Sequence, residues 1–215
     1  MIVAIHQPHY MPWLGYLRKM KDADLFVYLD KTDYTKNYFI NRNKILINDE
    51  KRWLTVPVLT KGRIGQAIKD VEVNWSRPRC EWNDRHCRIL LQNYSKCIRD
   101  KQEKIKEFYD FKGKLLIDWC IRSVELLRQA FGIKTPIIFE SDLDVSGVRT
   151  KRLVNICRVV GADTYLSGTG AKKYIDIELF DNIDFKYLNW RPSSDLSALH
   201  YLLNEKINAL EEGSD

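Results

Sequence analysis

Short apolar runs alternate with amphipathic segments along most of the chain. The first two runs, at residues 2–5 and 25–29, are rich in β-branched and aromatic residues, which is typical of buried strands. Further strands are predicted in the segments TPIIFESD, ADTYLSG and FKYLNW. Because helical patterns separate these strands, the chain is predicted to form βαβ units. The expected fold is a Rossmann-like α/β fold, with a mostly parallel sheet flanked by helices.

Helices are predicted where apolar residues recur every three or four positions. Such spacing occurs at residues 13–21, 116–131, 153–160 and 196–210. Gly132 and Gly161 follow two of these segments, in the position where glycine commonly ends a helix. Another helix is predicted to start at Ala171, after a glycine-rich turn.

The region after the second strand has a different pattern. Residues 38–47 and 53–58 alternate in polarity around the turn sequence NDEK, and residues 68–73 alternate in the same way. We therefore expect an antiparallel β-rich insertion at about 31–75, followed by a helical segment at about 78–131. No internal repeat or low-complexity linker divides the sequence, so residues 1–215 are predicted to form a single α/β domain.

Composition is compatible with a globular chain that stays out of the membrane. Hydrophobic residues make up 45% of the 215, and no apolar run approaches the roughly 20 needed for a membrane span. The apolar start ends at His6, too soon for a signal peptide, so a cytoplasmic location is expected. The net charge of +6 is moderate, and its basic residues are mixed with acidic ones along the chain. No nucleic-acid partner is expected, and an anionic small molecule suits this charge equally well.

The five cysteines are odd in number and include no C-x-x-C pair. We expect reduced thiols, because a chain without an export signal rarely depends on disulfides. Cys80, His86 and Cys87 are close in sequence, but their spacing fits no standard zinc pattern. No metal site is predicted.

Polar residues follow three of the predicted strands where those strands end. They are His6, Gln7, His9 and Tyr10 after the first strand, Asp30 and Tyr34 after the second, and Ser167 and Gly168 after a later one. The carboxyl ends of parallel strands share one edge of a sheet, where ligands bind. We therefore expect His6, Asp30 and Ser167 to converge there.

His6 is the candidate general base at this edge, with Asp30 as its orienting partner. Pro8 and Pro12 restrict the backbone of the loop that follows it. Imidazole is suited to proton transfer near neutral pH, and a neighbouring carboxylate would raise its pKa. The structural alternative is that His6 only ends the strand while Trp13 and Tyr16 are core aromatics.

Two other segments could bind an anion. In LSGTGAKKY, small residues precede a predicted helix, so backbone N–H groups could converge on an anion, with Lys172 and Tyr174 as partners. The segment is not a Walker loop, and a left-handed turn would explain its glycines equally well. In NRNK, Arg42 could bind a carboxylate or phosphate, or could simply lie at a polar strand end.

The opening segment IHQPHYMPWLGYLRKM and the later motifs resemble the WbqC-like family. The matching motifs are H-Q-P-x-Y-x-P-W-x-G-Y, a strand ending in Asp, a Tyr and N-R-N. Here they comprise His6, Gln7, Pro8, Tyr10, Pro12, Trp13, Gly15, Tyr16, Asp30, Tyr34, Asn41, Arg42 and Asn43. A later segment supplies Thr150, Arg152, Leu153, Tyr165, Ser167, Gly168, Lys172 and Tyr174. His200 stands where the family usually has Asp.

The resemblance implies a role in surface-polysaccharide (O-antigen type) biosynthesis, for which glycine or aminoacyl transfer has been proposed. The leading hypothesis is therefore an acyltransferase acting on a nucleotide- or lipid-linked amino sugar, with an acyl carrier or aminoacyl donor as second partner. The sequence requires no cofactor, and an activated acyl donor or ATP could supply the energy. The expected roles are His6 and Asp30 in catalysis, and substrate binding by Gln7, Tyr10, Tyr16, Tyr34, Asn41, Arg42, Asn43, Lys44, Ser167, Gly168, Lys172 and Tyr174.

Two alternatives remain open. An ATP-dependent ligase or nucleotidylyltransferase would use His6 and His9, although the H-x-G-H motif of such enzymes lacks its glycine here. A non-catalytic protein that binds a sugar or a carrier would use the aromatic residues of the opening segment for stacking.

Overall fold

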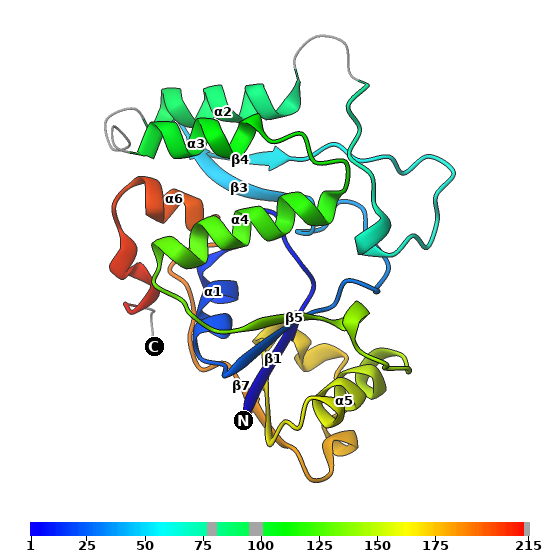
Figure 1. Ribbon diagram of the computed structural model, residues 1–215. Coiled ribbons are helices and arrows are strands. Elements are labelled where there is room, and N and C mark those ends of the chain that lie inside the picture. Colours follow the sequence, from blue (N-terminus) through cyan, green and yellow to red (C-terminus); the bar gives the residue numbers. More distant parts are fainter. Residues whose placement is uncertain (77–80, 95–100, 213–215) are drawn as a thin grey trace.

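The computed structural model describes residues 1–76, 81–94 and 101–212. Five parallel strands form one sheet in the order β5-β2-β1-β6-β7, as Figure 1 shows in part. Their bounds are β1 (Ile2–His6), β2 (Leu25–Tyr28), β5 (Ile137–Phe139), β6 (Thr164–Ser167) and β7 (Asp184–Tyr187). A separate antiparallel hairpin pairs β3 (Arg42–Ile47) with β4 (Glu50–Thr55). The predicted α/β fold class is confirmed.

Helices pack on both faces of the sheet and beside the hairpin. They are α1 (Leu14–Lys21), α2 (Trp82–Asn93), α3 (Gln102–Asp110), α4 (Leu116–Ala130), α5 (Arg149–Val159) and α6 (Ala198–Leu203). In β1, Ala4 packs into the core cluster formed with α1 and α4, whereas Val3 and Ile5 pack into the cluster that contains α5. This alternation is the two-residue period of a strand buried on both faces. Figure 1 shows α4 and α5 on opposite sides of the sheet.

The helix ends follow the glycine pattern of the sequence. Gly132 lies two residues beyond α4 with φ +67°, and Gly161 lies two residues beyond α5 with φ +71°. Both backbones are left-handed, a conformation that glycine adopts without a steric penalty. The predictions for these two helix ends are confirmed.

The predicted β-rich insertion contains one hairpin and no third strand in the described residues. Asn48 and Asp49 form the two-residue turn, both with positive φ, as a type I′ turn requires. The strand predicted at 68–73 does not form as such, because Ile68–Asp70 is a 3-10 helix and Glu72 and Val73 form only isolated antiparallel bridges, to Leu115 and Val58. Ile68 and Val71 are both fully buried, and their spacing of three matches a 3-10 turn rather than a strand.

Two predicted helices are also shorter than expected. The segment after Gly168 forms only the 3-10 helix Thr169–Lys173. The helix predicted at 196–210 is divided, because α6 ends at Leu203 and Glu205 adopts a φ of +58°. A 3-10 helix, Ile207–Leu210, completes that segment.

Some sequence predictions lie outside the described residues, including the start of the helical segment at about 78 and both Cys80 and Cys97. Across the described ranges, no group of three or more His, Cys, Asp or Glu side chains is placed to hold a metal ion. No helix in the same ranges has both the length and the apolar character needed to cross a membrane.

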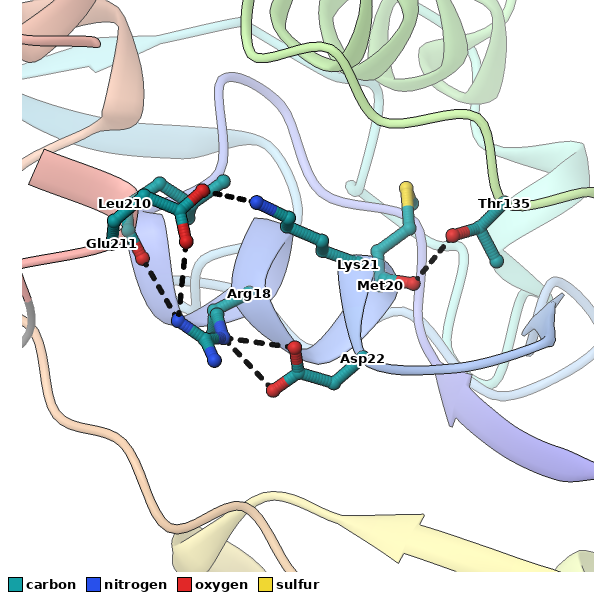
Figure 2. A network of polar contacts seen from close by, with 7 residues as sticks. All are labelled: Arg18, Met20, Lys21, Asp22, Thr135, Leu210 and Glu211. Atoms are coloured by element: carbon teal, nitrogen blue, oxygen red, sulfur yellow. Dashed lines mark hydrogen bonds and ion pairs between the residues drawn. The ribbon is translucent and has the colours of Figure 1, made fainter. Parts of the chain in front are cut away.

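The C-terminal end of α1 is fixed by polar contacts within the helix end and to two other segments, one at residues 210–211 and one at Thr135 (Figure 2). Arg18 Nε donates to both carboxylate oxygens of Asp22 at 2.9 Å, and its guanidinium also donates to the Leu210 carbonyl at 3.2 Å. Lys21 forms an ion pair with Glu211. On the other side, Thr135 Oγ1 donates to the carbonyl oxygen of Met20 at 2.8 Å. These contacts hold in place the helix that carries Tyr16 and Lys19.

Candidate functional site

A cavity of about 1110 Å³ lies at the carboxyl ends of β1 and β6. His6 and Gln7 line it from β1, and Ser167 and Gly168 line it from β6. The chain runs from β1 outward to β2 and β5, then returns to β6 on the other side of β1. The gap between β1 and β6 is therefore the point where the strand order reverses, which is the usual ligand site of an open parallel sheet.

His6 is held as a neutral imidazole. Its Nδ1 donates to the Gln7 carbonyl oxygen at 3.0 Å, so Nε2 carries the free lone pair. Burial, together with the nearby Lys19, lowers the pKa of His6 to about 3. The expectation that Asp30 raises this pKa is contradicted. With a pKa this far below neutral, His6 is a weak base and a good hydrogen-bond acceptor.

Aromatic rings surround His6 at this end of the cavity. The His6 ring lies 4.7 Å from the ring of Tyr16 and 5.8 Å from that of Trp13. Gly15 permits this arrangement, because a Cβ there would lie 2.8 Å from Nε1 of Trp13. Trp13 therefore lines the cavity instead of serving only as a core residue.

His9 lies in the same aromatic group and has no polar partner. Its ring stacks on Tyr16 at 5.6 Å, and the side chain is 1% exposed. Neither ring nitrogen forms a hydrogen bond with any residue that the structure describes. Burial and the neighbouring His6 keep the pKa of His9 well below its usual value. A buried imidazole without partners is costly, and a polar group of a bound ligand would satisfy it.

Cationic side chains also line the cavity. They are Arg149, Arg152, Lys173 and Arg191, with Lys19 deeper inside, and none of the described lining residues is acidic. Arg149 begins α5 with a left-handed φ of +50°, a strained backbone of the kind often found at ligand sites. Arg152 Nε lies 2.8 Å from the fully buried carboxylate of Glu140. The excess of positive charge suits an anionic ligand.

The loop after β6 contributes backbone to the cavity. Ser167 is fully buried and its hydroxyl donates to the Gly168 carbonyl at 3.3 Å. Gly168 has a φ of −73°, and a Cβ at this position would meet nothing within 4 Å. The left-handed turn considered from the sequence is therefore wrong at Gly168. The glycine instead leaves open space beside the backbone.

Of the other predicted residues, Gln7, Tyr16 and Tyr174 line this cavity. Gln7 is fixed through a hydrogen bond from its Nε2 to Thr32 Oγ1 at 3.0 Å, and Tyr16 donates its hydroxyl proton to the Gln7 carbonyl. Tyr174 lies at the rim and is 73% exposed. Lys172 does not line the cavity, because its Nζ lies 4.9 Å from the centre of the Tyr187 ring. The neighbouring Lys173 faces the cavity in its place.

Asp30 is not the partner of His6. Its Oδ1 accepts a hydrogen bond from the Ser141 amide at 3.0 Å, and the side chain is 2% exposed. The carboxylate therefore holds the turn after β5, and it does not line the cavity. Tyr34 also lies outside the cavity, where burial raises its pKa to about 12.

The predicted residues of the hairpin region fix the structure around the site. Asn41 Nδ2 donates to the Val56 carbonyl at 2.8 Å, and Asn43 Nδ2 donates to the Met11 carbonyl at 2.7 Å. These two bonds hold β3 against the segment after β4 and against the N-terminal loop. Neither asparagine lines the cavity.

The cationic residues of the same region are paired elsewhere. The Arg42 guanidinium lies 4.2 Å from the Trp53 ring centre, and Lys44 forms an ion pair with Asp195 at 2.5 Å. Neither lines the cavity, contrary to the expected role in anion binding.

Two further side chains belong to hydrogen-bond networks away from the cavity. The hydroxyl of Tyr10 is buried between His86 Nδ1 and the hydroxyl of Tyr109, at 3.1 and 2.7 Å. His200 Nδ1 contacts the hydroxyl of Tyr94 at 2.9 Å. Tyr10 is thus a core residue instead of a ligand-binding one.

Several cavity residues were missed from the sequence. Lys19 lies three positions after Tyr16 on α1, so both project to one face, and this spacing was the available signal. No comparable spacing from a predicted site residue pointed to Arg149 or Lys173. Arg191 follows β7, whose carboxyl end lies at the same edge of the sheet.

Comparison with known proteins assigns the chain to a family. The model of the WbqC-like protein family matches residues 7–203. The chain belongs to the WbqC-like family. A relative from Mycobacterium tuberculosis, the uncharacterized protein Rv1507c, is 30% identical over 192 residues, covering 86% of this chain and 79% of its own. No solved structure matches. The match to the WbqC-like family includes every cavity residue from Gln7 onward.

Proposed function

We propose that this WbqC-like protein transfers an acyl group, such as an aminoacyl group, onto an amino sugar carried on a diphosphate, in surface-polysaccharide biosynthesis. The cavity carries this proposal, because its described lining has five Lys or Arg side chains and no Asp or Glu. A diphosphate would be held by Arg149 and Lys173 at the rim. The cavity volume of about 1110 Å³ is large for a small-molecule site and suits a substrate the size of a nucleotide-linked sugar.

The aromatic residues of the cavity could bind the sugar of such a ligand. Trp13 and Tyr38 offer ring faces against which a sugar can stack. His6 Nε2 and the ring nitrogens of His9 offer hydrogen bonds to hydroxyl groups. In this arrangement the sugar lies against the histidines and the diphosphate points toward α5.

The direct test is calorimetric titration with UDP-glucosamine, compared with UDP and with free glucosamine. Binding of UDP-glucosamine that is tighter than binding of either fragment supports the proposal. Equal affinity for UDP and UDP-glucosamine would contradict a sugar subsite. A polyprenyl-diphosphate-linked glucosamine in detergent distinguishes a lipid carrier from a nucleotide carrier, because both present the same diphosphate.

Neutralising the rim charge should weaken this binding. We expect Lys173→Gln and Arg149→Gln each to raise the Kd for UDP-glucosamine about tenfold, through loss of a charge-assisted hydrogen bond. Lys172→Gln is the matched control, because this neighbouring lysine lies over Tyr187 outside the cavity. If Lys172→Gln weakened binding as much as Lys173→Gln, a general charge effect would replace the proposed subsite.

A methyl group at Gly168 should affect binding without affecting folding. The backbone φ of −73° is accessible to alanine, and a Cβ would meet no atom within 4 Å. We expect Gly168→Ala to change the free energy of unfolding by no more than about 0.5 kcal/mol. Because the methyl enters the space proposed for the ligand, the Kd for UDP-glucosamine should rise at least fivefold. Unchanged affinity in calorimetry would remove this loop from the binding site.

A further inference from the structure

Lys19 is an unusual lysine, because α1 delivers it to the interior of the cavity without an acidic partner. Its side chain is 4% exposed, and Nζ donates to the Ile5 carbonyl oxygen at 2.7 Å. The pairing of β1 with β6 ends at Ala4. The Ile5 carbonyl that accepts from Lys19 therefore lies one residue beyond the last β1 residue paired with β6. In the described part of the chain, no Asp or Glu forms an ion pair with it.

The groups named here around Lys19 carry no negative charge at pH 7. His6 lies on β1, His9 on the following loop, Tyr165 on β6 and Cys157 on α5, and all are neutral at pH 7. The Tyr165 ring centre is 5.8 Å from Nζ. Burial lowers the pKa of Lys19 to about 7, and Cys157 opposes this shift. About half of the Lys19 side chains therefore hold a neutral amine at pH 7, roughly a thousandfold more than for an ordinary lysine.

We propose that Lys19 is the catalytic base of the cavity, accepting the proton that the sugar amine loses during acyl transfer. This assignment rests on the proposed function and deepens it. The amine nitrogen bonds to the carbonyl carbon of an ester or thioester donor, and the carbon–oxygen or carbon–sulfur bond to the carrier breaks. The proton passes from the amine to Lys19 Nζ and then to the leaving oxygen or sulfur.

His6 then has a different part in the reaction. Its Nε2 lone pair can accept a hydrogen bond from the substrate, whereas Nδ1 is already bound to the Gln7 carbonyl. Its pKa of about 3 makes it far weaker as a base than Lys19. His6 is accordingly a positioning residue.

The assignment is tested by nuclear magnetic resonance of the whole protein labelled with ¹³C at the lysine Cε. The Lys19 resonance is assigned as the one absent from Lys19→Met, and Lys21→Met on the same helix is the matched control. The titration midpoint of Lys19 is measured without ligand and with saturating UDP-glucosamine. Calorimetry on the same samples shows independently whether UDP-glucosamine binds.

A midpoint near 7 that moves by half a pH unit or more with UDP-glucosamine supports Lys19 as the base. A midpoint near the ordinary lysine value of about 10.4 overturns the assignment. It is equally overturned if UDP-glucosamine binds and leaves the Lys19 midpoint unchanged. If the midpoint is near 7 but calorimetry detects no binding, the result supports Lys19 as a proton acceptor and contradicts the proposed substrate class.

Discussion

Lowering the pH from 7 to 5 is expected to reduce the free energy of unfolding by about 4 to 6 kcal/mol, or about 2 kcal/mol per buried histidine. Burial lowers the pKa values of His6 and His86 to about 3 and that of His9 well below normal. As the pH falls, the histidines of the unfolded chain therefore take up protons near pH 6.5, before those of the folded protein do. The contribution of the histidines to stability is complete above that pH and is lost as the pH falls toward their folded-state pKa values. Urea unfolding at several pH values measures the effect.

His9→Phe is the variant that isolates one of these histidines. Phenylalanine can keep the ring contact with Tyr16 and removes two nitrogens that have no hydrogen-bond partner. We expect the loss of stability between pH 7 and 5 to be smaller in this variant, because phenylalanine has no proton to take up. The lowered carboxyl pKa values of Asp195 and Glu211 act only below about pH 4.5 and do not enter this range. An unfolding midpoint equal at pH 7 and 5 in the natural protein would refute the assignment.

The sequence predicted the edge of the sheet that forms the cavity, because strand periodicity is a local property. Residues that directly follow β1 and β6, such as Gln7 and Ser167, line the cavity as the carboxyl-end rule requires. The rule locates an edge without specifying where each side chain points. Asp30 also follows a strand, but it bonds to Ser141, which is 111 positions later in the chain. No local pattern contains that contact.

The electrostatic character of the site could not be predicted for a related reason. The pKa of His6 depends on burial and on Lys19, thirteen positions away on the next element. The sequence suggested a nearby carboxylate, which would have had the opposite effect. Likewise, Lys172 and Lys173 are equivalent in sequence, and the five-residue 3-10 helix decides which faces the cavity.

Removing the charge of Arg152 should destabilise the fold strongly. Its guanidinium is the ion-pair partner of Glu140, whose side chain is completely buried. We expect Arg152→Met to lower the free energy of unfolding by about 3 kcal/mol at pH 8, because the buried carboxylate of Glu140 loses its ion-pair partner and keeps only the contacts from Lys31. Burial already raises the pKa of Glu140, and loss of Arg152 would raise it further. The penalty should therefore shrink toward pH 5, where the carboxyl takes up a proton.

The double variant Glu140→Gln with Arg152→Met separates this structural role from ligand binding. Because it removes both charges, it should recover most of the stability lost in Arg152→Met. The cavity would still lack one of its five cationic side chains, so the Kd for UDP-glucosamine should stay about tenfold above that of the natural protein. Restored stability with fully restored binding would show that Arg152 only neutralises Glu140. If stability is not recovered, the buried ion pair is not the cause of the loss, and Arg152 stabilises the fold through its other contacts.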